Sequence, residues 1–123
     1  MNGYIAFYKG KQVDNLSGAA LDWAVARCEG YVPFTDTISW LIERDGQYMK
    51  LPQYSTDWAQ GGPIIERERI RIDCPWNPGP FEATCRIDGV TGWMIAPTVL
   101  TAAMRCYVAA KLGDEIDVPE ELK

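Results

Sequence analysis

The sequence predicts an α+β fold, in which an antiparallel sheet has two main helices packed against it. Two Asp-Gly pairs, Asp45-Gly46 and Asp88-Gly89, each separate two runs of strand-forming residues. This arrangement is a strong signal for a β-hairpin. Helix-like patterns occur near residues 17–30 and 97–113. The chain has 123 residues and no long linker or repeat, so we expect a single domain over residues 1–113.

Composition excludes several classes of protein. The chain is 47% hydrophobic and 24% charged, which is enough apolar surface for a core and too little charge for a disordered protein. No apolar run approaches the roughly 18 residues of a membrane span, and no signal peptide is recognisable. We therefore expect no membrane partner and a location in the cytoplasm of the producing cell.

The acidity of the chain is concentrated at its end. Of the net charge of −5, the last ten residues contribute −4, because they hold five carboxylates and one lysine. We expect residues 114–123 to form an acidic tail with little fold of its own. The body, at −1, lacks the basic surface of a duplex-binding protein, so no duplex nucleic acid is expected as a partner. A small anionic ligand held by a few arginines is compatible with this balance.

The cysteines and the absence of histidine restrict the chemistry. No two of Cys28, Cys74, Cys85 and Cys106 form a C-x-x-C pair, and the chain has no histidine. This argues against a structural zinc site and against serine or cysteine triads. We expect four reduced thiols, mostly buried, and neither a metal nor a cofactor. No catalytic constellation is recognisable, so the protein is predicted not to be an enzyme.

The first helix is predicted from Ser17 to about Gly30. Ser17 is a favourable N-cap, and Gly30 is a favourable stop. Leu16 and Leu21 occupy the positions of a hydrophobic staple. The apolar stripe that should face the core consists of Leu21, Ala24, Val25 and Cys28. Trp23 lies off this stripe, so it is expected either to pack against a sheet or a second subunit, or to stack on a ligand.

The strands are predicted from runs of β-branched and aromatic residues. These runs cover residues 37–43, 47–51, 70–74, 81–87 and 90–95. The segment 75–80 is too rich in proline for a central strand and is predicted to be a loop. Residues 4–13 suggest an opening strand or a short hairpin with its turn at 9–11.

The central segment, residues 54–68, has no regular period. It joins aromatic rings, hydroxyls, a carboxylate and the pair Gly61-Gly62. We interpret it as a structured loop followed by a helical turn from Pro63 to about Glu68, because proline is favoured in the first turn of a helix. Loops of this kind often carry function, and the alternative is a well-packed corner without a ligand.

The arginines after Pro63 have two interpretations. In a helical turn they would be part of a solvated mixture of charges with Glu66 and Glu68. If residues 64–69 were a strand, Arg67, Arg69 and Arg71 would share one face and form a candidate anion groove. We favour the helical turn.

The last helix is predicted to open at Pro97 and to stop at Gly113. Many of its side chains are small, which permits close packing on a sheet or on another helix. Arg105 is the only charge between Pro97 and Ala110. A lone guanidinium on an apolar helix requires a partner, and this partner is either an internal carboxylate, such as Asp57 or Asp22, or a phosphate.

Three blocks of the chain resemble NinX-like proteins of tailed phages and prophages. They are residues 17–26, the central segment 54–68, and residues 97–109, and they occur in the order of that family within residues 16–118. The function of the family is unknown, so the resemblance implies phage origin more than an activity. The expected location is then the cytoplasm of the infected bacterial host.

The candidate site residues come from the central segment and the last helix. Aromatic rings can stack on a base, while arginines and loop amides can hold phosphates. We expect the two segments to meet, with Arg105 near residues 54–62. The predicted ligand-binding residues are Arg105, Tyr54, Ser55, Thr56, Trp58, Gly61, Gly62 and Arg67.

The hypothesis from these features is a phage-encoded anti-defence protein that sequesters a small nucleotide signal, such as a cyclic ADP-ribose isomer or a cyclic oligonucleotide. In size and build the chain also resembles, in type only, the anti-Thoeris and anti-CBASS sponge proteins of phages. The alternative is a protein–protein inhibitor or adaptor acting on a host enzyme, and a small hydrolase is the third option. Five tryptophans and six tyrosines are many for one core, so a homo-oligomer is expected.

Overall fold

The computed structural model describes residues 10–36 and 38–122, and within them the α+β class is confirmed. Short 3₁₀ turns occur at Val13–Asn15 and Glu120–Leu122. The strands and α-helices, in chain order, are β1 (Lys11–Gln12), α1 (Gly18–Cys28), β2 (Phe34–Thr35), β3 (Trp40–Arg44), β4 (Gln47–Lys50), α2 (Trp58–Arg67), β5 (Arg71–Asp73), β6 (Phe81–Ile87), β7 (Val90–Ala96), α3 (Val99–Leu112) and β8 (Glu115–Ile116).

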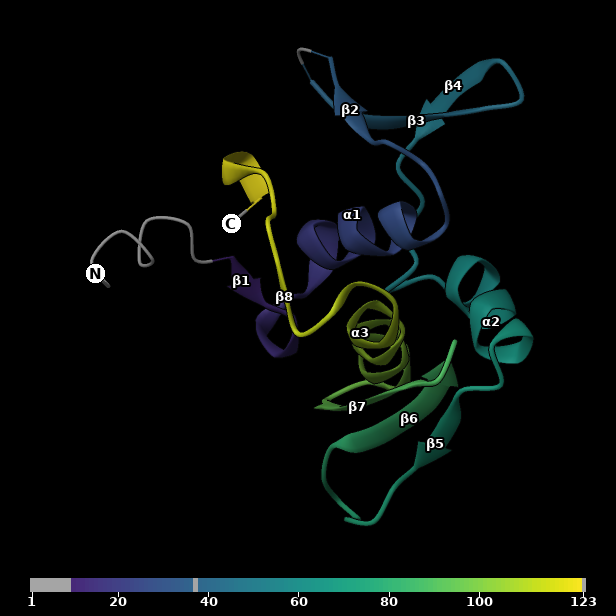
Figure 1. The fold of residues 1–123 in the computed structure, drawn as a ribbon, viewed down its shortest axis with the longest axis vertical. Coiled ribbons are helices and arrows are strands. Elements are labelled where there is room, and N and C mark those ends of the chain that lie inside the picture. The colour runs from purple at the N-terminus through teal and green to yellow at the C-terminus, as the bar shows by residue number, and fades with distance from the viewer. Residues whose placement is uncertain (1–9, 37, 123) are drawn as a thin grey trace.

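Both predicted hairpins are confirmed, in β3–β4 and in β6–β7. Asp45 and Gly46, like Asp88 and Gly89, all have positive φ, as the two-residue turns of twisted hairpins require. The hairpins do not join one sheet, however. The described strands form three small antiparallel sheets, with the orders β1-β8, β2-β3-β4 and β5-β6-β7. The prediction of a single sheet was wrong, because α1 and α3 lie between the sheet β2-β3-β4 and the sheet β5-β6-β7 (Figure 1).

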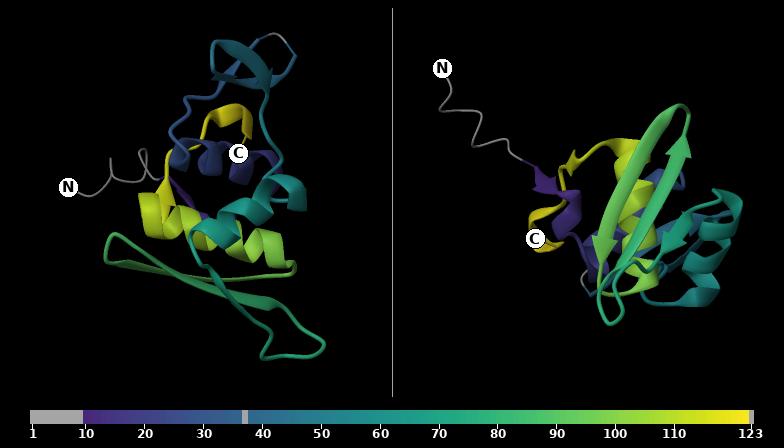
Figure 2. Two further views of the ribbon diagram at one scale, coloured as in Figure 1. Left: turned by 90° about the vertical axis from the view of Figure 1, so that its right-hand side faces the viewer. Right: turned by 90° about the horizontal axis from the view of Figure 1, so that it is seen from below.

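Helix α3 lies at the centre of the fold (Figure 1). The sheet β5-β6-β7 covers one side of it, and α1 covers the opposite side, an order that the side view also shows (Figure 2). The sequence predicted that α3 packs on a sheet or on another helix, and in the structure it packs on both. Its small side chains let both layers approach closely, and its buried residues are Leu100, Ala102, Ala103, Met104, Cys106, Tyr107, Val108, Ala109 and Ala110.

Helix α1 begins after Ser17, as predicted, and its apolar stripe is buried. Leu16 and Leu21 are both fully buried, in agreement with the hydrophobic staple. Trp23 is half-buried against the core, and the guanidinium of Arg27 lies 5.8 Å from the centroid of its ring. Asp22 is buried, and its carboxylate accepts a hydrogen bond of 2.8 Å from the Ser55 main-chain N–H. This bond ties α1 to the central segment.

Helix α2 begins earlier than the sequence suggested. Its first residue is Trp58, and Pro63 lies inside the helix, so the prediction of a loop followed by a turn at Pro63 was wrong. The Asp57 carboxylate caps the helix by accepting hydrogen bonds from the Ala59 N–H (3.0 Å) and from the Gln60 side chain (2.7 Å). An N-cap stabilises a helix start, and Pro63 removes only one interior hydrogen bond, so the capped start prevails.

The C-terminal residues are more ordered than predicted. Strand β8 pairs antiparallel with β1, and the side chains of Ile116 and Val118 are buried in the core. The expectation of a tail with little fold was therefore wrong for this segment, because two apolar side chains among the carboxylates anchor it. Most of the predicted opening strand, including part of its proposed turn at 9–11, lies outside the described residues.

Within the described ranges, no helix is long and apolar enough to cross a membrane. The same residues contain no group of three or more Cys, Asp or Glu side chains placed to hold a metal ion. The cysteines are unbridged; Cys28, Cys85 and Cys106 are buried, whereas Cys74 is exposed.

Candidate functional site

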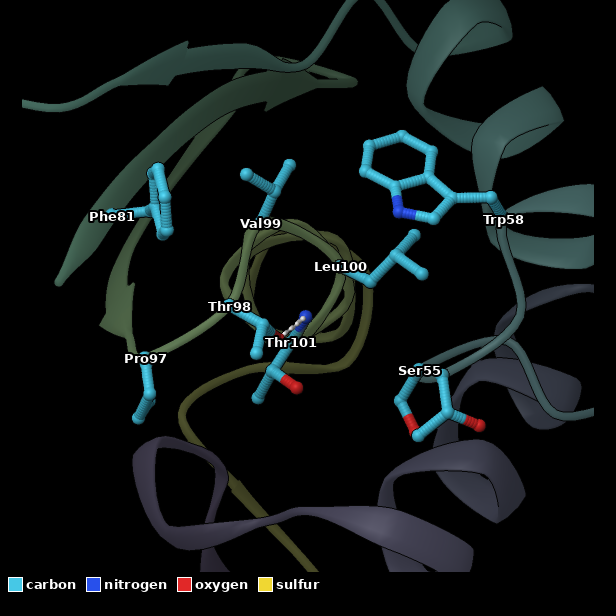
Figure 3. A pocket seen from close by; sticks show the side chains of 9 residues that line it. Ser55, Trp58, Phe81, Pro97, Thr98, Val99, Leu100 and Thr101 are labelled. Atoms are coloured by element: carbon cyan, nitrogen blue, oxygen red, sulfur yellow. Dashed lines mark hydrogen bonds between the residues drawn. The ribbon is translucent and has the colours of Figure 1, made fainter.

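A cleft of about 410 Å³ opens between the central segment and the start of α3 (Figure 3). We call it the aromatic cleft, and its lining consists of Ser55, Thr56, Trp58, Phe81, Pro97, Thr98, Val99, Leu100 and Thr101. The expected meeting of the central segment and the last helix is thereby confirmed. The volume lies within the range of small-molecule sites, roughly 300–1,000 Å³.

Two aromatic rings flank the aromatic cleft. Trp58 is 57% exposed, and in Figure 3 its indole lies across Val99 and Leu100 from the ring of Phe81. Trp58 is the first residue of α2, so the Asp57 cap fixes the backbone from which the indole projects. An exposed indole held in place in this way can stack on a planar ring.

The start of α3 provides hydrogen-bond donors beside the two rings. The Thr98 hydroxyl accepts the N–H of Thr101 at 3.2 Å, and the Thr98 carbonyl accepts the N–H of Ala102 at 3.0 Å. The N–H groups of Val99 and Leu100 therefore stand at the helix start, where no intrahelical acceptor exists. Together with the dipole of a 14-residue helix, they favour an electronegative group at this end.

The turn before α2 carries the hydroxyls of the cleft. Ser55 is buried and Thr56 is exposed. The Asp22 carboxylate holds the Ser55 N–H, and burial raises the pKa of Asp22 although this hydrogen bond and the nearby Ser55 side chain lower it. The Ser55 Oγ itself makes no hydrogen bond of good geometry with any described residue.

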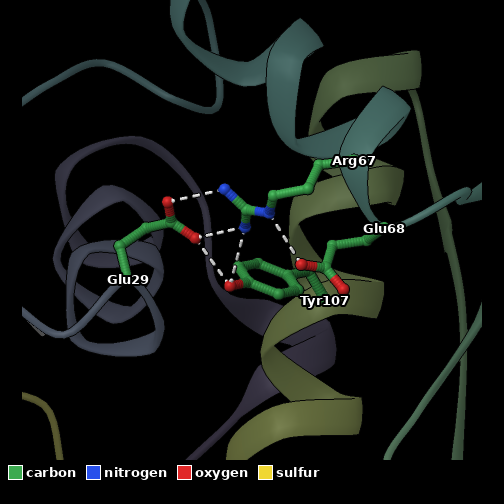
Figure 4. A network of polar contacts seen from close by, with 4 residues as sticks. All are labelled: Glu29, Arg67, Glu68 and Tyr107. Carbon is green, nitrogen blue, oxygen red and sulfur yellow. Dashed lines mark hydrogen bonds and ion pairs between the residues drawn. The ribbon is translucent and has the colours of Figure 1, made fainter.

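Arg67 does not reach the aromatic cleft. Its guanidinium forms two hydrogen bonds with Glu29, of 2.6 and 3.1 Å, and one of 2.8 Å with Glu68 (Figure 4). The Tyr107 hydroxyl donates to the same Glu29 carboxylate at 2.6 Å. The network joins the end of α1 to α2 and α3. Arg67 thus has two carboxylate partners within the protein. The sequence suggested Glu68 as a partner but did not suggest Glu29.

This network predicts a pH dependence of stability. Burial alone would raise the pKa of Glu29, but the hydrogen bonds from Arg67 and Tyr107 lower it below its usual value of 4.5. A carboxylate with a lowered pKa stabilises the folded state above 4.5, and this stabilisation disappears as the pH falls through the folded-state pKa.

We therefore expect Glu29→Gln to reduce the free energy of unfolding at neutral pH, and the difference from the wild type to shrink as the pH falls below about 4.5. Urea unfolding at a series of pH values measures it. Glu66→Gln, a change at an exposed carboxylate on α2, is the matched control and should have little effect. A difference for Glu29→Gln that grows on acidification would contradict the assignment.

Arg105 is also occupied within the protein. Its Nε donates to the Leu16 carbonyl at 2.7 Å, and its Nη1 donates to the Ile95 carbonyl at 3.2 Å. Burial lowers the pKa of its guanidinium. Its hydrogen-bond partners are main-chain carbonyls, and neither Asp57 nor Asp22 is among them. Arg105 is absent from the lining of the aromatic cleft, and its role as a ligand-binding residue stays a prediction.

The two glycines belong to α2 and not to a loop. A Cβ on Gly61 would overlap the carbonyl oxygen of Tyr54 and lie 2.8 Å from Leu100 Cδ2. A Cβ on Gly62 would make only an ordinary contact of 3.5 Å with the Trp58 ring. Gly61 therefore allows α2 to pack against the turn and α3, and neither glycine is in the lining of the cleft.

Of the predicted site residues, the structure thus brings together Ser55, Thr56 and Trp58. Tyr54 and Arg67 line a different groove, between the β3–β4 hairpin and α2. Sequence reasoning missed Phe81 and the residues around Thr98. Thr98 carried a recognisable signal as an N-cap next to Pro97, whereas no local pattern places Phe81 opposite Trp58.

Comparison with known proteins agrees with the sequence blocks. The family model for NinX of bacteriophage P22 matches residues 12–111, which include all three α-helices except the last residue of α3. A search of curated protein sequences found no match. The weaker resemblance to nucleotide-sequestering proteins has no support in these comparisons. Because the match covers most of the chain, both sides of the aromatic cleft included, the chain belongs to the bacteriophage P22 NinX family.

Proposed function

We propose that this phage protein binds a small nucleotide-like molecule in the aromatic cleft and holds it without turnover. The observation that carries the proposal is the exposed indole of Trp58, at the edge of a cleft of about 410 Å³ and beside the open N–H groups of α3. A ring for a base and donors for an oxyanion thus lie in one cleft of suitable size.

Each part of such a ligand finds a complementary group. The base stacks on Trp58, with Phe81 on the far side of the cleft. A phosphate oxygen accepts from the N–H groups of Val99 and Leu100. The lining contains no charged side chain, so the cleft favours ligands that carry little charge per base. Cyclic nucleotides and cyclic ADP-ribose isomers fit this requirement better than linear polyphosphates.

Absence of turnover is part of the proposal. The chain has no histidine, and the hydroxyl of Thr98 is used as a cap. The carboxylate next to Ser55 is that of Asp22, which is buried and accepts the Ser55 N–H. These features favour binding over general-base catalysis. In the cytoplasm of an infected cell, a protein that holds a nucleotide in this way would remove a signal produced by a host defence system.

Thermal unfolding and calorimetry with a panel of cyclic dinucleotides and cyclic ADP-ribose isomers test the proposal. A bound ligand raises the melting temperature by mass action. Trp58→Ala should weaken binding by about tenfold or more, since stacking contributes roughly 1–3 kcal/mol per base. Trp93→Ala is the matched control, because Trp93 is similarly exposed (53%) but lies outside the aromatic cleft.

Three results would overturn the proposal. One is a panel that leaves the melting temperature unchanged, another is equal loss of affinity in both tryptophan variants, and the third is modified ligand. To test for the last, the ligand is recovered from the denatured complex and its mass is measured. An unchanged mass means sequestration, whereas a changed mass means an enzyme.

A second candidate function is that of a protein–protein inhibitor or adaptor of a host enzyme. It is favoured by the three exposed indoles of Trp58, Trp76 and Trp93, because exposed aromatic rings are typical of interface cores. A protein of this kind would not respond to the nucleotide panel. It would bind its target with the aromatic cleft empty, and Trp58→Ala and Trp93→Ala would then affect target binding and not ligand binding.

The same exposed indoles predict that the protein is at least a dimer. Burying such rings against a second copy removes apolar surface from water. Light scattering at micromolar concentration should give at least twice the chain mass of 13.8 kDa. A mass of one chain would remove this prediction while leaving the ligand proposal intact.

A further inference from the structure

Two thiols lie in direct contact where β6 packs against α3 (Figure 1). The Sγ atoms of Cys85 on β6 and Cys106 on α3 are 3.2 Å apart. Cys85 is 4% exposed, and Cys106 is completely buried. Neither Cys28 nor Cys74 makes a hydrogen-bond contact with another sulfur in the part of the chain that the structure describes. Cys85 and Cys106 are therefore a distinct pair within the core.

The pairing of β6 with β7 explains why the two sulfurs meet. Cys85 lies directly opposite Gly92, and directly paired residues share one face of a sheet. Because Gly92 has no side chain, α3 comes close to the sheet at this point, and a Cβ on Gly92 would overlap the Cys106 carbonyl oxygen. The Cys106 thiol also lies 3.3 Å from the Gly92 carbonyl oxygen. A disulfide forms only between closely spaced backbones, and Gly92 permits this spacing.

The two thiols differ in acidity. The Cys106 thiol donates a hydrogen bond to Cys85 Sγ, and this bond lowers the pKa of Cys85 although burial opposes the shift. The same bond, together with burial, raises the pKa of Cys106. Since a thiolate is the form that attacks an oxidant, Cys85 is the sulfur that reacts first and Cys106 is the sulfur that completes the bridge.

We propose that Cys85 and Cys106 form a peroxide-sensitive dithiol, which closes to a disulfide within the folded chain. The Cys85 thiolate attacks one oxygen of hydrogen peroxide, the O–O bond breaks, and the hydroxide released takes up a proton to become water. The Cys106 sulfur then attacks the sulfenic acid on Cys85, the S–S bond forms, and a second water leaves with the thiol proton. In total the two thiols lose two electrons and two protons, and the peroxide accepts them.

The burial of the pair restricts which oxidant reaches it. Hydrogen peroxide is close to water in size, so it reaches the sulfurs when the sheet opens locally, whereas a larger oxidant requires a larger opening. Neither cysteine is in the lining of the aromatic cleft. This proposal and the proposed function can therefore fail separately.

Mass spectrometry of the folded, full-length chain after treatment with hydrogen peroxide tests the pair. The variant Cys74→Ser is used, because the exposed Cys74 thiol could link two chains. The intact mass should fall by the mass of two hydrogen atoms, and peptide mapping should find the bridge between Cys85 and Cys106. Dithiothreitol should restore the mass, since a disulfide is reducible whereas sulfinic and sulfonic acids are not.

Cys28 is the matched control within the same chain. It is buried, and burial raises its pKa to about 12. It should stay reduced and be labelled when the treated chain is denatured and alkylated. The same variant treated while unfolded in urea should give a mixture of bridges, because unfolding removes the contact that selects one pair.

The bridge should also raise the melting temperature by several degrees, because it restricts the unfolded chain between residues 85 and 106. The proposal is overturned if the folded chain keeps all its thiols reduced, or if it gives the same mixture of bridges as the unfolded chain. It is equally overturned if Cys28 is oxidised as fast as the pair, or if the bridged chain melts at a lower temperature than the reduced one.

Discussion

Gly61→Ala is expected to lower the free energy of unfolding by about 2–3 kcal/mol. The added methyl group would overlap the main-chain carbonyl of Tyr54, and a backbone atom cannot move aside as a flexible side chain can. The only route to relief is a shift of α2 away from the turn and from Leu100, which would open the core at the junction with α3. Urea unfolding measures the change.

Gly62→Ala is the matched control, because it makes the same chemical change one residue further along the same helix. The new methyl group would make an ordinary contact of 3.5 Å with the Trp58 ring, and alanine is the better helix former by about 1 kcal/mol. We therefore expect unchanged or slightly higher stability. Equal effects of the two substitutions would mean that the close approach at Gly61 does not constrain the position of α2.

Arg105→Met is expected to lower the free energy of unfolding by about 2–4 kcal/mol. The substitution keeps an apolar stem of similar length and removes the donors for the carbonyls of Leu16 and Ile95. Leu16 precedes α1 and Ile95 is near the end of β7, so one side chain on α3 links both layers that cover it. Arg105→Lys should not restore stability, because an ammonium lacks the planar group that spans two carbonyls.

Arg86→Met is the control for this substitution, because Arg86 is exposed and forms no salt bridge with any described residue. It should change stability by no more than about 0.5 kcal/mol. If Arg105→Met folds with the stability of the wild type and loses affinity for a nucleotide, the arginine serves a ligand and the internal role is wrong. If Arg105→Met loses stability and Arg86→Met does not, the result supports the internal role.

The position of Arg105 illustrates what a sequence can and cannot reveal. An isolated charge on an apolar helix signals a need for a partner, and this need was recognised. The partners are the carbonyls of Leu16 and Ile95, 89 residues away in one case. Every residue carries a carbonyl, so no residue type marks which of them will accept the bond. For the same reason we expected a carboxylate to be the internal partner of Arg105, and this expectation was wrong.

The sequence by itself determined the elements whose signals lie in consecutive residues. The Asp-Gly turns require positive φ, Ser17 and Gly113 mark helix ends, and a periodic apolar stripe marks a buried face. Tertiary structure alone decided that the hairpins belong to separate sheets and that Trp58 faces Phe81. These outcomes depend on how α1, α2 and the sheet β5-β6-β7 pack around α3, and packing sums many weak contacts between residues distant in the chain, none of which has a local signal.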